Sequence, residues 1–348
     1  MGGVELFVPG RLCLFGEHSD WAGSYRSSDP SLPPGRCLVA GTDQGLWGRA
    51  RPAEGVFEIR QVGPDGVHGP PHSHPADCPA LRRVAAEADF DAYAAGTAAV
   101  LLERFPGLGL SLDVFRRDLP LRKGLSSSAA VCVLTARAFS RVHGLGLSVD
   151  EEMDLAYRGE LLTGSECGRM DQVCAVGRAV TDLRFEGEAM SLEEVTPGSQ
   201  VHLLVVDLRA GKDTRRILAD LNSAFAAGDG GVRDALGPLN LSIAARARKA
   251  LEAGDIEALG GLMTEAQREF DRLLAPVCPS QLAAPRLHAV LGHPAVQRHA
   301  WGGKGVGSGG DGTAQLLCRG PSHRAALARE LSRHLRVRCL PLTLSPSM

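Results

Sequence analysis

The spacing of hydrophobic residues along this chain alternates between the periods typical of strands and of helices. Short apolar runs predict strands, and residues 201–208 are the clearest of them. Longer stretches with helical spacing predict helices, most strongly over residues 237–275. A helix expected at about 126–143 is apolar nearly all round, which predicts that it is buried. The chain therefore mixes strands and helices along its whole length.

The same pattern locates the remaining elements. Further strands are predicted at residues 4–8, 12–15, 38–40, 45–51, 110–114, 179–186, 313–318 and 337–342. Further helices are predicted at residues 81–105 (as two helices), 149–162 and 321–334. Ser148 and Glu151 have the spacing of a capping box. Pro9 and Gly10 are expected to separate the first two strands. A polar segment at 187–200 predicts a boundary between an N-terminal domain, residues 1–190, and a C-terminal domain, residues 191–348.

Composition narrows the class of protein. The 348 residues are 44% hydrophobic and 22% charged, enough for one large or two ordinary domains. A net charge of −2 gives no electrostatic basis for binding nucleic acid or an anionic membrane. The chain contains no run of eighteen apolar residues, so no membrane span is expected. Its N-terminus lacks the pattern of a signal peptide. Nine cysteines without a C-x-x-C pair suit a reducing compartment, so we expect a soluble, cytoplasmic protein.

A long irregular connection is predicted over residues 63–80, and it contains three histidines. His68, His72 and His74 would suit a metal ion by residue type. No carboxylate or thiol stands at a fitting spacing beside them. A solvated loop is therefore the favoured interpretation.

Residues 120–130 form a Gly/Ser-rich loop that leads into the buried helix. Backbone N–H groups and the positive end of a helix dipole hold phosphate in such loops. Gly124 allows close approach of the backbone, and the serines at 126–128 offer hydroxyls to phosphate or Mg²⁺. The Gly-Lys-Ser/Thr ending of a Walker A loop is missing. A serine-rich helix cap is the alternative explanation.

A second stretch, residues 9–21, carries Arg11, Glu17, His18 and Asp20 directly after an apolar opening. Together with the Gly/Ser loop it resembles the motifs of the GHMP kinases, the family of galactokinase, homoserine kinase, mevalonate kinase and phosphomevalonate kinase. Residues 9–20 resemble the first motif in its galactokinase form, residues 120–130 the second, and residues 302–312 the third, a glycine-rich loop. The three occur in the family's order and at its usual spacing.

The resemblance implies roles for the first motif. Arg11 would stabilise the transferring phosphoryl group or the substrate oxyanion. Glu17, His18 and Asp20 would hydrogen-bond a polyol. Mevalonate kinases have Lys after Pro-Gly and small apolar residues after Gly-Glu-His, so Asp20 favours a hydroxyl-rich substrate.

A fourth element also resembles a family segment, one that carries a metal ligand and a catalytic carboxylate eleven residues apart. By that resemblance Glu160 is a Mg²⁺ ligand with Ser128, and Asp171 is the base that takes the acceptor proton and contacts the substrate. The residues expected to bind ATP phosphates are Lys123, Gly124, Leu125, Ser126, Ser127, Ser128, Ala129, Gly307, Ser308 and Gly309.

The implied fold is a two-domain α+β GHMP kinase architecture, with an S5 domain 2-like N-terminal domain and a ferredoxin-like C-terminal domain. The implied reaction is Mg²⁺-dependent transfer of the ATP γ-phosphoryl group to a hydroxyl, the anomeric one in galactokinase-like members, of a monosaccharide or sugar acid. A mevalonate-type alcohol kinase and an inactive ligand sensor of the same fold are the alternatives. The sequence leaves open the roles of Trp21 and Asp311, the identity of the sugar and the oligomeric state.

Overall fold

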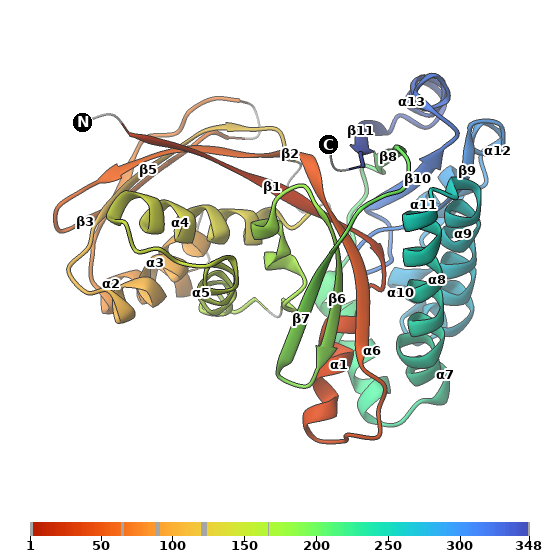
Figure 1. Ribbon diagram of the computed structural model, residues 1–348, viewed down its shortest axis with the longest axis horizontal. Coiled ribbons are helices and arrows are strands. Elements are labelled where there is room, and N and C mark those ends of the chain that lie inside the picture. The colour runs from red at the N-terminus through yellow and green to blue at the C-terminus, as the bar shows by residue number, and fades with distance from the viewer. Residues whose placement is uncertain (1–2, 64–65, 88–90, 120–123, 166, 347–348) are drawn as a thin grey trace. The chain divides into compact units, whose positions relative to one another are not determined.

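The computed structural model describes residues 3–346 except 64–65, 88–90, 120–123 and 166, and the chain divides into two compact units (Figure 1). Unit 1 comprises residues 1–11 and 41–178, and unit 2 comprises residues 12–40 and 179–348. The predicted domains 1–190 and 191–348 are consecutive, whereas these units interleave. The reason is that two long strands, β1 (Val4–Phe15) and β2 (Gly35–Pro52), each contribute residues to both units. The division into functional domains at residue 190 stays a prediction.

Unit 1 pairs a sheet with a layer of helices. The strands follow the order β4-β3-β5-β2, in which β3 and β5 are parallel and the other pairs antiparallel. Four helices pack against one another on one side of this sheet (Figure 1). Phe57 of the sheet stacks on Phe139 of a helix, with ring centroids 6.3 Å apart. The elements are β3 (Val56–Gln61), β4 (His72–Pro75), β5 (Leu110–Arg117), α2 (Cys78–Ala86), α3 (Ala92–Arg104), α4 (Ser127–His143), α5 (Val149–Leu161) and the 3₁₀ turn η2 (Asp171–Val176).

Unit 2 contains a four-stranded antiparallel sheet of order β11-β8-β10-β9. Numbered along the chain these strands stand in the order 4-1-3-2, with helices after the first and third, which is the ferredoxin-like topology. The prediction of a ferredoxin-like domain is thereby confirmed. The strands are β8 (Val201–Asp207), β9 (Ala300–Gly305), β10 (Thr313–Cys318) and β11 (Arg338–Leu344), and buried Leu204, Leu316 and Leu331 belong to the core between sheet and helices.

The other elements of unit 2 are mostly helical. The helices are α1 (Ser19–Ser24), α6 (Thr214–Ala226), α7 (Gly230–Asp234), α8 (Asn240–Ala253), α9 (Ile256–Leu273), α10 (Pro279–Leu282), α11 (Pro285–Leu291), α12 (Pro294–His299) and α13 (Pro321–Leu335). Short turns are η1 (Tyr25–Ser27), η3 (Ala235–Leu239) and η4 (Ala275–Val277), and the strands β6 (Val180–Glu186) and β7 (Ala189–Val195) complete the unit.

The predicted break at Pro9 and Gly10 is wrong, because β1 continues through both residues. Within the sheet β1 pairs with β2 alone, and an edge strand tolerates the missing N–H of a proline. A Cβ at Gly10 would lie 2.3 Å from Leu119 Cδ1, so glycine serves close packing here. The two short strands expected at residues 38–51 are likewise one strand, β2.

The polar segment predicted as a domain boundary contains a strand, β7. It pairs antiparallel with β6 across a two-residue turn at Gly187 and Glu188, and Gly187 has a φ of 65°. The exposed face of β7 is polar, which masked the strand period in the sequence. The capping box of Ser148 and Glu151 at the start of α5 is confirmed.

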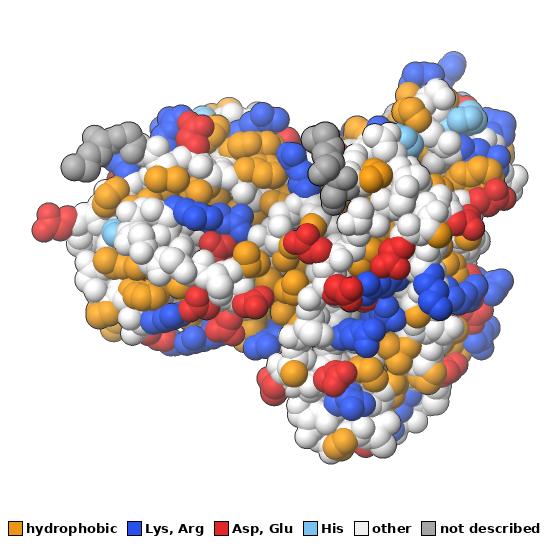
Figure 2. All heavy atoms as spheres, in the orientation of Figure 1, with side chains coloured by type: hydrophobic (Ala, Val, Ile, Leu, Met, Phe, Trp, Pro, Cys, Tyr) orange, Lys and Arg blue, Asp and Glu red, His pale blue; other side chains and the backbone are white. Residues whose placement is uncertain are grey.

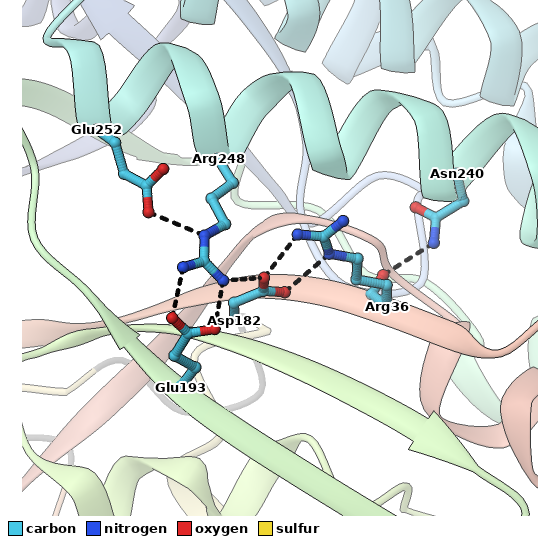
Figure 3. Close-up of polar contacts among 6 residues, drawn as sticks. All are labelled: Arg36, Asp182, Glu193, Asn240, Arg248 and Glu252. Carbon is cyan, nitrogen blue, oxygen red and sulfur yellow. Dashed lines mark hydrogen bonds and ion pairs between the residues drawn. The ribbon is translucent and has the colours of Figure 1, made fainter.

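A network of charged side chains ties β2, β6, β7 and α8 together within unit 2 (Figure 3). Arg36 donates two hydrogen bonds to Asp182, at 3.0 and 2.7 Å, and Arg248 donates a third at 2.9 Å. Arg248 also contacts Glu193 through both terminal nitrogens and Glu252 through Nε. The Asp182 side chain is 1% exposed, so its charge is neutralised inside the unit.

Acidic and basic side chains are mingled on the face drawn in Figure 2, in line with the net charge of −2. Within the described part of the chain, none of the helices has the length and apolar character needed to span a membrane.

Candidate active site

In unit 1 the structure brings together the predicted catalytic pair. Arg11, in β1, donates from Nη2 to Oδ1 of Asp171, the first residue of η2. The Arg11 side chain is 7% exposed and that of Asp171 is 26% exposed. The carboxylate therefore reaches solvent while the guanidinium stays buried.

Arg11 keeps donor capacity that the described residues do not use. Its Nε and Nη1 atoms are buried and make no hydrogen bond with them. Its backbone N–H donates to the carbonyl of Leu125, 3.1 Å away, which fastens the first motif to the Gly/Ser loop. Buried donors without partners are costly, so this arrangement suits an anionic oxygen supplied by a ligand.

The Gly/Ser loop begins the buried helix α4 in an unusual conformation. Ser126 precedes the helix with a φ of 55°, and Gly124 has a φ of 71°. The Ser126 hydroxyl makes no capping hydrogen bond and is buried without a partner among the described residues. The alternative of a serine cap therefore does not explain Ser126. Ser127, Ser128 and Ala129 form the first turn of α4, and Lys123 lies outside the described residues.

Glu160, near the end of α5, lies beside the predicted metal ligand Ser128. Its side chain accepts a hydrogen bond from Gln172 Nε2 at 2.8 Å, and the Ser128 hydroxyl is near enough to lower the pKa of Glu160. Burial raises the pKa of Glu160, and Ser128 and Gln172 act in the opposite direction. A hydroxyl and a carboxylate side by side are oxygen ligands of the type that Mg²⁺ prefers, so the residues fit this ion.

In unit 2 the predicted substrate residue Glu17 forms an ion pair with Lys304 of β9. The two side chains are 11% and 6% exposed, and Lys304 Nζ also donates to the carbonyl of Gly305 at 3.0 Å. Gly16, before Glu17, has a φ of 92°, and a Cβ there would lie 2.2 Å from the carbonyl oxygen of Arg36. Close packing therefore fixes the position of Glu17.

His18 is buried and neutral. Trp21 Nε1 donates to His18 Nδ1 at 3.1 Å, and Phe270 stacks on the imidazole with ring centroids 6.2 Å apart. Burial lowers the pKa of His18 to about 4, with Lys212 and Lys304 adding to the shift. An indole N–H can only donate, so Nδ1 must be unprotonated, which agrees with the lowered pKa. The role of His18 toward a substrate stays a prediction.

The two residues whose roles the sequence left open have structural contacts. Trp21 packs edge-on against Phe225, with centroids 5.7 Å apart, in addition to its bond with His18. Asp311 accepts hydrogen bonds from the backbone N–H groups of Arg286 and Leu287, at 3.3 and 2.9 Å. Asp311 thus caps the start of α11. Asp20 lies in the first turn of α1 and is partly exposed.

The glycine-rich stretch at 302–312 forms part of β9 and the turn into β10. Gly307 and Gly309 have φ values of 68° and 90°, which only glycine adopts at little cost. Ser308 Oγ lies 3.3 Å from the hydroxyl of Thr214, and Lys212 Nζ donates to the carbonyl of Val306. Gly307 is partly exposed and Ser308 is buried, and the binding of phosphate by Gly307 to Gly309 stays a prediction.

The histidine loop has carboxylate partners that the sequence did not suggest. His72 Nδ1 and His74 Nε2 lie 2.7 and 3.2 Å from one oxygen of Asp91, and His68 lies 3.9 Å from Asp113. In the described part of the chain, no three His, Cys, Asp or Glu side chains are arranged to hold a metal ion. The interpretation of residues 63–80 as wholly irregular is wrong in part, because β4 lies within them.

Two residues of these constellations were missed from the sequence. Lys304 interrupts a run of glycines, and this break in the pattern could have identified it as a candidate site residue. Gln172 follows the predicted base directly, and only the structure shows its bond to Glu160.

Comparison with known proteins identifies the fold and the N-terminal domain. Residues 92–178 match the family "GHMP kinases N terminal domain". A mevalonate kinase from Aeropyrum pernix is 33% identical over 157 residues, which cover 43% of this chain and 45% of that protein. The aligned segment therefore spans less than half the length of this relative.

Solved structures of both kinase types share the fold over nearly the whole chain. A mevalonate kinase from L. major, in complex with R-mevalonate, has a TM-score of 0.75 at 19% identity and covers 99% of this chain and 96% of that one. Lactococcus lactis galactokinase complexed with galactose has a TM-score of 0.72 at 16% identity and covers 98% and 93%. Residues 92–178 thus form a GHMP kinase N-terminal domain, and the chain as a whole has the α+β fold of the GHMP kinases that it matches.

Proposed function

We propose that the protein is an ATP-dependent kinase that transfers the γ-phosphoryl group to a hydroxyl of a small polyol, a monosaccharide or sugar acid. The observation that carries this proposal is the pair of Arg11 and Asp171. A buried guanidinium with two nitrogens unused by the described residues stands next to a carboxylate that reaches solvent. Phosphoryl transfer requires this combination of positive charge and an acceptor for the hydroxyl proton.

The roles of the residues follow from their chemistry. Asp171 takes the proton from the attacking hydroxyl, and Arg11 donates to the oxygen atoms on which negative charge accumulates. In unit 1, the Gly/Ser loop with Ser126 offers N–H and hydroxyl donors to the nucleotide phosphates. Ser128 and Glu160 would hold Mg²⁺, which when bound neutralises phosphate charge.

The choice of a polyol rests on the first motif. Arg11 follows Pro-Gly where mevalonate kinases have Lys, and Asp20 adds a hydrogen-bonding carboxylate in the first turn of α1. The galactokinase form of this motif favours the anomeric hydroxyl as the phosphoryl acceptor. Mevalonate is the second candidate acceptor, because the relative that shares 33% identity is a mevalonate kinase.

A coupled assay of ADP release tests this proposal with hexoses, pentoses, uronic acids and mevalonate as acceptors. Turnover with a sugar or sugar acid that exceeds turnover with mevalonate supports it. Selective turnover of mevalonate replaces the polyol with the second candidate. Binding of ATP without ADP release from any acceptor would instead indicate a ligand sensor.

A further inference from the structure

A cavity in unit 2 is lined by both Glu17 of the first motif and Lys304. Its wall is formed by the end of β1, the start of α8, the middle of α9 and the glycine-rich turn. Polar and apolar side chains share this wall, and the polar ones are Glu17, Asn240, Gln267, Glu269 and Lys304. The cavity therefore offers hydrogen bonds as well as apolar surface to a small molecule.

The pair of Glu17 and Lys304 is nearly buried but not saturated. Lys304 Nζ has three donors, and two of them are used by Glu17 Oε1 and the Gly305 carbonyl. The other carboxylate oxygen of Glu17 accepts no hydrogen bond from the described residues and is not fully enclosed. One acceptor and one donor thus stand side by side on the cavity wall, in a pair whose charges cancel.

Neighbouring groups hold this pair in place. Gln267, 7% exposed, accepts from the Gly305 backbone N–H at 2.6 Å and anchors the strand end that carries Lys304. Asn240 donates to Ser19 Oγ at 3.0 Å and to the Arg36 carbonyl at 2.8 Å, and Figure 3 shows this second bond. The Ser19 hydroxyl contacts the carbonyl of Gly16, next to Glu17. The recognition groups are therefore preorganised on both sides.

We propose that Lys304 determines acceptor specificity by presenting, together with Glu17, one donor and one acceptor to two neighbouring hydroxyls of the substrate. One hydroxyl donates to the unused oxygen of Glu17, and the next accepts from the Lys304 ammonium. The ion pair of Glu17 and Lys304 has no net charge to attract an anion. It therefore favours a vicinal diol over a lone carboxylate group. This inference rests on the proposed function, because it takes the bound diol to be the acceptor of the phosphoryl group.

Loss of Lys304 removes a charged hydrogen bond to the ligand and leaves Glu17 buried without its partner. The variant Lys304→Met is expected to weaken diol binding roughly 10- to 100-fold. Lys304→Arg keeps a charged donor and is expected to retain part of the affinity. Lys249→Met, at an exposed lysine of α8, is the matched control and is expected to change nothing.

The test combines binding and turnover. Calorimetry measures the affinity of wild type and variants for the acceptor that turns over fastest and for an analogue lacking one of its two adjacent hydroxyls. If no sugar turns over, D-galactose and 2-deoxy-D-galactose are the probes. The wild type should bind the diol at least tenfold better, and Lys304→Met should lose this preference while the KM for ATP stays the same.

Each outcome is decisive. A folded Lys304→Met protein that keeps the preference for the diol overturns the inference, as does a wild type with no preference or no binding. If Lys304→Met fails to fold, the double variant Lys304→Met/Glu17→Gln, which removes both charges, replaces it. An unchanged ratio of the affinities for the diol and its deoxy analogue in this double variant refutes the inference. Absence of ADP release from a wild type that binds the diol refutes the proposed function and leaves the diol site supported.

Discussion

Two charged clusters of this protein differ in how completely their polar atoms are paired. In the cluster of unit 2 drawn in Figure 3, Asp182 receives hydrogen bonds on both oxygens and Arg248 contacts three carboxylates. In unit 1, Arg11 donates to Asp171 and leaves Nε and Nη1 buried without a partner among the described residues. A saturated cluster stabilises the fold, whereas an unsaturated one is ready to bind a ligand.

Substitution in the unsaturated cluster is therefore expected to affect activity, and substitution in the saturated cluster is expected to affect stability. Buried polar groups are normally paired, so an unpaired one beside a predicted catalytic residue is a candidate for contact with a substrate. Ser126 Oγ and Gln172 Oε1 of unit 1 share this property with Arg11, and so do His18 Nε2 and Gln315 Oε1 of unit 2.

The largest expected effect is on catalysis at the unsaturated cluster. Asp171→Asn keeps the size of the side chain but cannot take a proton, so kcat should fall about 10²- to 10⁴-fold while ATP affinity is retained. Steady-state ADP release and calorimetry with ATP measure the two quantities. Asp150→Asn, at an exposed position of α5, is the control. An unchanged kcat would remove Asp171 from the role of base.

Breaking the saturated cluster should affect stability instead. Asp182→Asn leaves Arg36 and Arg248 without their shared buried carboxylate, and the free energy of unfolding should fall by about 3–5 kcal/mol. Urea denaturation measures this loss, and kcat per folded molecule should stay the same. A large loss of kcat with unchanged stability would reverse the interpretation of the two clusters.

The buried histidine predicts a loss of stability in acid. The folded pKa of His18 is about 4, below the ordinary value of 6.5, so between these values only the unfolded chain takes up a proton. Stability is therefore complete above pH 6.5 and is lost as the pH falls toward 4, by about 3 kcal/mol in total.

Urea denaturation from pH 7 to pH 4.5 tests this contribution. His18→Asn removes the titration and tolerates the left-handed backbone at this position, where φ is 69°. The variant should lose less stability than the wild type over this range. His288→Asn, at an exposed histidine of α11, is the control and should follow the wild type. Parallel curves for His18→Asn and wild type would contradict the lowered pKa.

The smallest effect is expected at the rim of the saturated cluster. The Glu193 side chain is 65% exposed although it contacts Arg248 through both oxygens. Solvent screens exposed ion pairs strongly, so Glu193→Gln should shift the urea midpoint by far less than Asp182→Asn. A shift of the urea midpoint as large as that of Asp182→Asn would mean that the stabilisation by each ion pair does not depend on its burial.

Local patterns were sufficient for most of the fold. The long helices α4, α5 and α9 and the strand β8 were predicted because their hydrophobic periods are strong, and Ser148 caps α5 as expected. The strand β7 and the continuity of β1 through Pro9 were not predicted, because pairing with neighbouring strands decides them.

By itself, the sequence determined the three motifs and the residue types of the site, since motif spacing is local information. Tertiary structure decided which of these side chains are paired: Arg11 with Asp171, Gln172 with Glu160, and Lys304 with Glu17. It also showed that Asp311 caps a helix and that His18 is held neutral by burial. Pairing and burial depend on residues far apart in the chain, here up to 287 positions for Lys304 and Glu17, and sequence spacing does not encode them.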